Sequence, residues 1–296
     1  MIGVPLGLLV CGMMWYGVMV TRHNIDVKNV DITSEKLPAS FNGYRIVQFS
    51  DVHTGTWGGD TAFVSKLVDS INALQPDVIM FTGDIVNRKT CELEPFHTVL
   101  KRLKAKDGVY SVLGNHDYGD YVDWSSAASK AANLQQLKDR QGEMGWKLLN
   151  NSHEFIKRGT DSIVVIGVEN WGEPPFGQYG DLVKAYKGKG VGLKDGNFKI
   201  LMTHNPEHWN QVVKKNSNID LSLSGHTHAM QIEADMFGQR FSPAAWRYMY
   251  WGGLYEDTGA DGTPSRLYVN IGAGEVGMPM RLGAVPELTV ITLRKK

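Results

Sequence analysis

The chain has 296 residues, 42% of them hydrophobic, which is enough for one large α/β domain whose core needs no disulfides. Its 31 basic and 31 acidic residues balance and no run of like charge occurs, so no nucleic-acid partner is expected. Only two cysteines are present, which supports neither a disulfide framework nor a cysteine-based zinc site.

Residues 1–22 are predicted to form a membrane anchor. The first twenty carry no charged side chain and are about long enough to cross the hydrocarbon of a bilayer. A cleaved secretory signal fits less well, because nothing basic precedes the apolar run, and a buried or interfacial helix is the alternative. Arg22 and Lys28 follow the uncharged run of residues 1–20, and basic residues favour the cytoplasmic side, so we expect a membrane-anchored protein with its globular part on the cytoplasmic face.

Residues 23–43 are predicted to be a linker and lead-in strand, and residues 44–296 a single catalytic domain. From residue 45 onward, short β-branched runs alternate with stretches of helical period, which predicts an α/β fold. The expected strands cover 45–50, 77–82, 109–113, 198–202 and 219–223, and the expected helices cover 61–74, 92–105, 125–141 and 206–215. Residues 170–196, rich in glycine, are expected to form a long surface excursion, and strands at 266–270 and 287–293 a second sheet.

Each of the five expected strands runs into a polar turn that carries side chains able to bind metal. They are Asp51, His53, Asp84, Asn115, His204, His226 and His228. Ligands of α/β proteins bind outside the carboxyl ends of the strands, so these side chains can converge there. Glycines at 83, 114 and 225 would allow the backbone to turn sharply and approach closely.

The chemistry of this set predicts a site for two divalent ions. Carboxylate, amide oxygen and imidazole without thiolate suit manganese, iron, zinc or magnesium, with manganese favoured here. Seven such groups are more than one ion normally takes from protein, so two ions that share a carboxylate are expected.

The ordered series Asp-x-His, Gly-Asp, Gly-Asn-His-Asp, His and Gly-His-x-His resembles the calcineurin-like metallophosphoesterase superfamily over residues 45–228. The resemblance implies an α/β fold, a four-layer αββα sandwich with two central mixed β-sheets. It implies a first metal held by Asp51, His53, Asp84 and His228. It implies a second metal held by Asp84, Asn115, His204 and His226, so that Asp84 bridges the two ions.

The same resemblance implies the chemistry. His116 would face the leaving group as a catalytic residue, with Asp117 as its orienting carboxylate, while a metal-bridging hydroxide attacks a phosphodiester or pyrophosphate bond in line. A phosphomonoesterase or phosphoprotein phosphatase is the alternative, and a non-catalytic metal-binding scaffold is a third possibility. The oligomeric state is left open.

Two further features bear on the substrate. Some anchored bacterial relatives are UDP-2,3-diacylglucosamine hydrolases, so a membrane-associated lipid or nucleotide-linked phosphate would suit the expected anchor. Aromatic residues crowd into 241–255, where they would either meet a membrane or acyl chains or simply cover the second sheet. Residues 268–287 resemble the C-terminal region of anchored bacterial members, and Arg281 is predicted to bind a substrate phosphate, with a structural salt bridge as the alternative.

Overall fold

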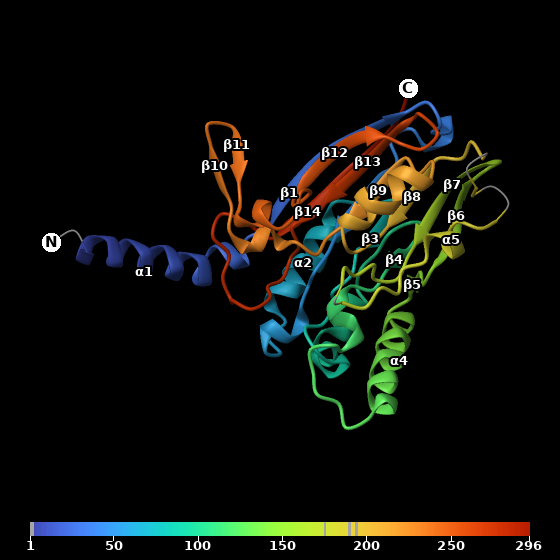
Figure 1. The fold of residues 1–296 in the computed structure, drawn as a ribbon. Helices are drawn as coiled ribbons and strands as arrows, with labels where there is room; N and C mark the ends of the chain where they lie inside the picture. Colours follow the sequence, from blue (N-terminus) through green and yellow to red (C-terminus); the bar gives the residue numbers. More distant parts are fainter. Residues whose placement is uncertain (1–2, 175, 189–190, 193–194) are drawn as a thin grey trace.

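Two six-stranded mixed β-sheets form the centre of the computed structural model, which describes residues 3–174, 176–188, 191–192 and 195–296 (Figure 1). The first sheet has the order β1 (Asp26–Ser34), β14 (Glu287–Lys295), β2 (Arg45–Phe49), β3 (Val78–Phe81), β4 (Val109–Ser111) and β5 (Trp146–Leu148). The second has the order β12 (Gly253–Thr258), β13 (Pro264–Val269), β9 (Leu221–Ser224), β8 (Lys199–Met202), β7 (Asp161–Gly167) and β6 (Ser152–Arg158). Strands β2 to β5 are parallel, as are β13, β9, β8 and β7.

The two sheets pack face to face and helices cover their outer faces. Alternation along β2 illustrates this, because Ile46 points into the core between the sheets while Val47 and Phe49 point outward to the helices. Helices α2 (Ala62–Ala73), α3 (His97–Leu100) and α4 (Ala127–Glu143) pack on the first sheet. Helix α5 (Leu182–Ala185) and the π-helical turn Trp209–Val213, which continues into α6 (Lys214–Asn216), cover the second. The predicted four-layer αββα sandwich is confirmed.

Strand β14 departs from the expected arrangement. The prediction that the C-terminal strands build the second sheet is correct for β13 but wrong for β14, which enters the first sheet between β1 and β2. The reason is burial, since Leu288 and Val290 pack under the helices while Ile291 and Leu293 pack between the sheets. A strand that is apolar on both faces needs an interior position in a sheet that is covered on both sides.

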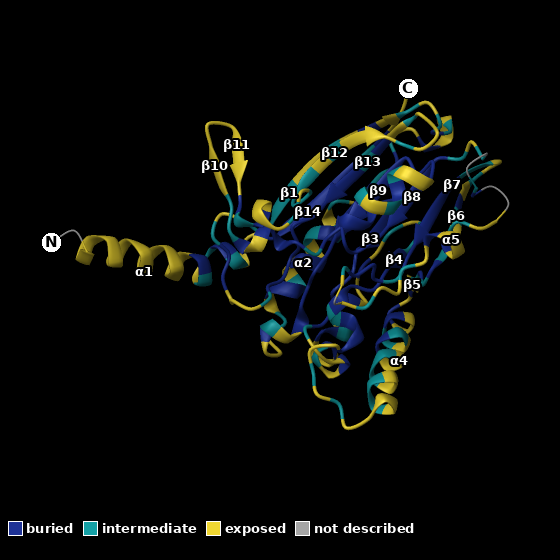
Figure 2. Cartoon of the chain, viewed as in Figure 1, coloured by how far each residue is buried: buried dark blue, intermediate teal, exposed yellow. Residues whose placement is uncertain are grey.

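The N-terminal helix α1 (Gly3–Met19) projects away from the sheets, and Figure 2 shows it exposed along most of its length. Among its described residues only Gly17 is buried. The helical stretch Gly3–His23 is long and apolar enough to cross a membrane. In the predicted surface excursion 170–196, α5 is the helix that forms, and residues 175, 189–190 and 193–194 lie outside the described residues.

Candidate metal centre

The turns that follow β2, β3 and β9 hold an unusual backbone conformation. Five of the seven predicted ligands have a positive φ, between 47° and 77°: Asp51, His53, Asp84, His226 and His228. A residue with a Cβ costs about 1 kcal/mol or more in this left-handed region. Such strain persists where the surrounding fold holds it for function, so this concentration marks the turns as a site.

Glycines let these turns crowd together. A Cβ on Gly83, whose φ is +101°, would lie 2.8 Å from Nδ1 of His204. A Cβ on Gly114 would lie 2.2 Å from Oδ1 of Asp84. The predicted close approach of the backbone at these glycines is confirmed, because a side chain at either would occupy the space of a predicted ligand.

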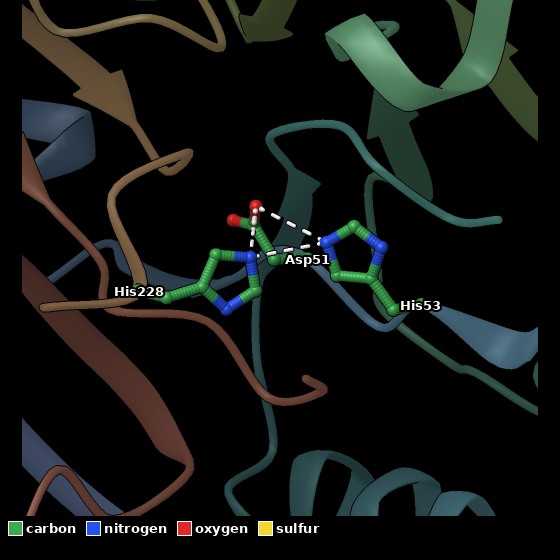
Figure 3. A group of neighbouring side chains, drawn as sticks. All are labelled: Asp51, His53 and His228. Carbon is green, nitrogen blue, oxygen red and sulfur yellow. Dashed lines mark hydrogen bonds and ion pairs between the residues drawn. The ribbon is translucent and has the colours of Figure 1, made fainter. Parts of the chain in front are cut away.

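Asp51, His53 and His228 form a first buried cluster, in which both rings turn one nitrogen toward the carboxylate (Figure 3). Nε2 of His228 lies 3.2 Å from Oδ1 of Asp51 and 3.0 Å from Nε2 of His53. Two ligands about 2.1 Å from a shared tetrahedral ion are roughly 3.4 Å apart, so these spacings suit a common cation. Without a proton or a cation, two facing imidazole lone pairs would repel.

A second cluster gathers around His204. Its Nε2 lies 3.1 Å from Oδ2 of Asp84, 3.1 Å from Oδ1 of Asn115 and 3.3 Å from Nδ1 of His226. Its Nδ1 lies 2.8 Å from the carbonyl oxygen of Thr82 and donates to it, which leaves the Nε2 lone pair facing the cluster. A carbonyl that fixes the tautomer in this way is the usual support of a metal-binding histidine.

Asp84 lies between the clusters. Its Oδ2 is 3.1 Å from Nε2 of His204 in the second cluster and 3.6 Å from Nε2 of His53 in the first. Its Oδ1 accepts a 2.8 Å hydrogen bond from the backbone N–H of His116, which holds the carboxylate in place. A single carboxylate therefore faces both groups.

The electrostatics of the buried groups favour cation binding. Burial alone would raise the pKa of Asp51 and of Asp84, but the neighbouring His228 and His204 outweigh it and keep each pKa below its ordinary value. Burial lowers the pKa of His53 to about 3, so its ring is neutral. Burial also acts to lower the pKa of His204, yet the Asp84 carboxylate prevails and raises it to about 9, so this position beside Asp84 stabilises positive charge.

His116 lies beside the clusters, whereas the carboxylate of Asp117 contacts backbone N–H groups and not the His116 ring. His116 is half-buried, and its Nδ1 lies 2.7 Å from the carbonyl oxygen of Asn87. The carboxylate of Asp117 instead accepts hydrogen bonds from the backbone N–H groups of Gly114, Asp84, Ile85 and Val86. The predicted contact between Asp117 and the His116 ring is therefore corrected: Asp117 ties two strand-end turns together, and a carbonyl orients His116.

Arg281 also lies elsewhere than predicted. Its side chain is fully buried and donates to the carbonyl oxygens of Gly274, Ile271 and Ala284. Its Nη2 lies 3.3 Å from Nδ1 of His228, on the side of the ring away from the cluster. Because its N–H groups are taken up by these carbonyls, Arg281 packs beside His228 and does not reach a substrate phosphate, which corrects that prediction.

The aromatic residues of segment 241–255 have different surroundings in the structure. Tyr250 and Tyr255 pack on the second sheet, as the alternative of a simple cover predicts. Tyr248 places its hydroxyl 3.3 Å from Nε2 of His226, whereas Trp246 is 91% exposed.

Tyr121 is a site residue that the sequence did not reveal. Its ring stacks on His116, with centroids 4.3 Å apart, and its hydroxyl accepts a 2.8 Å hydrogen bond from Nδ2 of Asn115. That bond orients the amide so that Oδ1 of Asn115 faces His204. The available signal was its position five residues after His116 in a glycine-containing turn, which matches no motif.

Comparison with known proteins agrees with this geometry. The family model described as calcineurin-like phosphoesterase matches residues 44–230, more than half of the chain. A transmembrane protein with metallophosphoesterase domain from Danio rerio is 29% identical over 95% of this chain, which spans 60% of that protein's length. The uncharacterized metallophosphoesterase YkuE of Bacillus subtilis is also 29% identical, over 94% of this chain and 89% of its own. Among solved structures, the sulfate thiohydrolase SoxB of Thermus thermophilus is 13% identical with a TM-score of 0.45, covering 87% of this chain and 57% of that one. The chain therefore belongs to the calcineurin-like phosphoesterase family of metal-dependent phosphoric ester hydrolases.

Proposed function

We propose that this chain hydrolyses a phosphodiester or pyrophosphate bond with two divalent ions, manganese favoured, held by the two clusters. The observation that carries the proposal is the position of Asp84, whose Oδ2 approaches a histidine of each cluster. Asp51, His53 and His228 would hold one ion, Asn115, His204 and His226 the other, and Asp84 both. Two ions at such a site supply an activated water and neutralise charge on the phosphoryl oxygens during in-line displacement.

In this proposal, His116 would deliver a proton to the leaving oxygen. It lines the pocket above the clusters, and its Nδ1 is engaged by the Asn87 carbonyl, which leaves Nε2 as the nitrogen available to substrate. A ring held in this orientation can carry a proton on Nε2 and release it as the bond breaks. Stacking on Tyr121 keeps the ring at this position.

The pocket that opens over the clusters favours an amphiphilic substrate. It has a volume of about 500 Å³, and Arg247 is the one lysine or arginine among its described lining residues. Its apolar lining residues include Met230, Val276 and Met278, which suit a hydrocarbon chain. The segment that carries Val276 and Met278 also meets the base of α1, because Nη1 of Arg22 donates to the carbonyl of Pro279. A lipid-linked phosphate ester would therefore enter with its chain on the anchor side and its polar group toward Arg247.

The catalytic domain is proposed to lie on the cytoplasmic face of the membrane. Arg22 and Lys28 follow the apolar helix, and basic residues after a span favour that side. Protease protection of right-side-out and inverted vesicles containing the full chain tests the orientation, since only inverted vesicles should expose the domain.

Parallel turnover assays test the chemistry. The full chain in detergent, loaded in turn with manganese, zinc, iron and magnesium, is assayed on bis-p-nitrophenyl phosphate, p-nitrophenyl phosphate and a lipid pyrophosphate. We expect the diester and the pyrophosphate to be cleaved faster than the monoester. A preference for the monoester would establish a phosphomonoesterase instead, and absence of turnover with every ion would indicate a metal-binding scaffold.

A further inference from the structure

A small β-hairpin stands apart from the sandwich, next to the N-terminal helix. In the part of the chain that the structure describes, strands β10 (Ala234–Met236) and β11 (Gln239–Phe241) pair only with each other and join neither six-stranded sheet. All six strand residues are exposed, and Figure 2 shows the hairpin as a projecting exposed element. An isolated two-stranded hairpin is at best marginally stable in water, so its apolar side chains need another explanation than packing within the fold.

The turn of this hairpin carries a phenylalanine where the fold would favour a different residue. Phe237 and Gly238 have φ values of 57° and 76°, and two consecutive positive φ values are typical of a two-residue type I′ turn. Asparagine or glycine suits the first of these positions, whereas a bulky side chain is strained there. The ring of Phe237 is also completely exposed. A residue that costs stability through both its backbone and its hydration points to an apolar partner outside the chain.

The neighbouring helix identifies that partner. A groove of about 790 Å³ separates α1 from the base of the hairpin, with Leu8, Leu9 and Met13 on one side and Ile232 and Ala234 on the other. Figure 1 shows the hairpin at the same end of the molecule as α1 and away from β6 and β7. When α1 crosses a bilayer, the hairpin is held beside that bilayer.

Two more exposed apolar side chains follow the hairpin in the chain, and Arg240, which together with Asp235 is one of the two charged residues of its strands, is paired. Trp246 is 91% exposed and Met249 is 69% exposed, and both follow the hairpin in the chain. Arg240 on the hairpin is paired with Glu233 through contacts of 2.5 and 2.9 Å, so that no net charge from this pair opposes entry into lipid. Tryptophan and phenylalanine gain free energy at the boundary between headgroups and acyl chains.

We propose that these residues form an insertion surface that enters the bilayer which α1 crosses. The insertion surface consists of Met236, Phe237, Phe241, Trp246 and Met249. Met230 and Gln231 line the pocket over the clusters, and the chain continues from them directly into the hairpin. Insertion would therefore hold the mouth of the pocket at the lipid headgroups. The proposal requires α1 to lie in the membrane and does not depend on which bond is cleaved.

Fluorescence of labelled full-length protein in vesicles tests the insertion surface. In a background of Cys11→Ala and Cys91→Ser, which removes the two free cysteines, single variants Phe237→Cys and Trp246→Cys carry an NBD label. The matched control is Thr160→Cys, an exposed position between β6 and β7, and Leu9→Cys in α1 serves as the reference for full insertion. The vesicles contain phosphatidylcholine and phosphatidylglycerol, with or without lipid that carries a nitroxide on its acyl chain.

We expect the labels at 237 and 246 to emit at shorter wavelength than the label at 160 and to be quenched severalfold by the nitroxide lipid, as at position 9. A water-like, unquenched spectrum at either 237 or 246, with position 9 inserted, would overturn the proposal. Phe237→Asn offers a second check, because asparagine fits the turn: thermal stability in detergent should be kept or increased while turnover of a soluble diester stays unchanged. A clear loss of stability would show that Phe237 supports the fold instead.

Discussion

Gly225 offers the sharpest test of the metal centre, because a single methyl group there collides with a predicted ligand. A Cβ at this position would lie 2.3 Å from Oδ2 of Asp51 and 2.0 Å from Oγ of Ser50. To restore even a 3.0 Å separation, Oδ2 must move by roughly 0.7 Å. Metal–ligand distances tolerate only about 0.2 Å, so Gly225→Ala should displace Asp51 from the first ion. Overpacking should also cost about 1–3 kcal/mol of stability.

The assay combines metal content with turnover and melting temperature. We expect Gly225→Ala to retain about one ion per chain instead of two, with turnover of bis-p-nitrophenyl phosphate reduced by roughly two orders of magnitude or more. Gly142→Ala in α4 is the matched control: apart from its own helix backbone, no atom of the described residues lies within 4 Å of its added Cβ, and alanine favours the helix by up to about 1 kcal/mol. Two bound ions and wild-type turnover in Gly225→Ala would refute the assignment of Asp51 as a ligand.

Three further predictions concern residues around the centre. His116→Gln should lower kcat by about 10²–10⁴-fold with metal content unchanged, and full activity would remove His116 from the reaction. Tyr121→Phe keeps the stacked ring but loses the hydrogen bond to Asn115, so kcat/KM should fall by about tenfold or less, and Tyr121→Ala should lose more. Burial raises the pKa of Glu275 from its ordinary 4.5 to about 7, against the charges of Arg22 and Arg281. The folded state therefore binds more protons than the unfolded state between these values, and stability should fall by up to about 1.4 kcal/mol per pH unit as the pH rises through this window. Glu275→Gln should remove that slope from the melting temperatures measured in detergent, whereas parallel curves for the two proteins would contradict the origin of the shift.

Local pattern was sufficient to select the candidate ligands that the structure brings together in two clusters. Buried parallel strands are continuously apolar, so the polar turn that ends each one stands out, as at Phe49 to Asp51 or Phe81 to Asp84. Parallel neighbours bring these turns to one edge of a sheet, which is why Asp51 and Asp84 could be grouped without coordinates. The glycines in these turns were also informative, because a glycine directly beside a candidate ligand indicates a close approach of the backbone.

The predictions that were wrong, and the features that the sequence did not reveal, depend on contacts between segments that are distant in the chain. Arg281 lies 53 residues from His228 in the chain. The sequence does not indicate that three backbone carbonyls accept hydrogen bonds from its side chain, which leaves it unable to bind a substrate. The backbone carbonyl of Asn87 orients His116. Every residue type has such a carbonyl, so the sequence does not show which one contacts the ring. The composition of strand β14 is compatible with an interior position in either sheet. Its pairing with β1 and β2, which are distant in the chain, places it in the first sheet.

The sequence by itself therefore determined the α/β class of the fold, the candidate metal-binding side chains and the apolar N-terminal helix, because each follows from a local period or spacing. Only the tertiary structure decided which atoms face one another: the central position of Asp84, the Tyr121 stack on His116, and the exposed Phe237 beside α1. These depend on the order of strands and the conformation of turns, where interactions between residues far apart in the chain outweigh local preference.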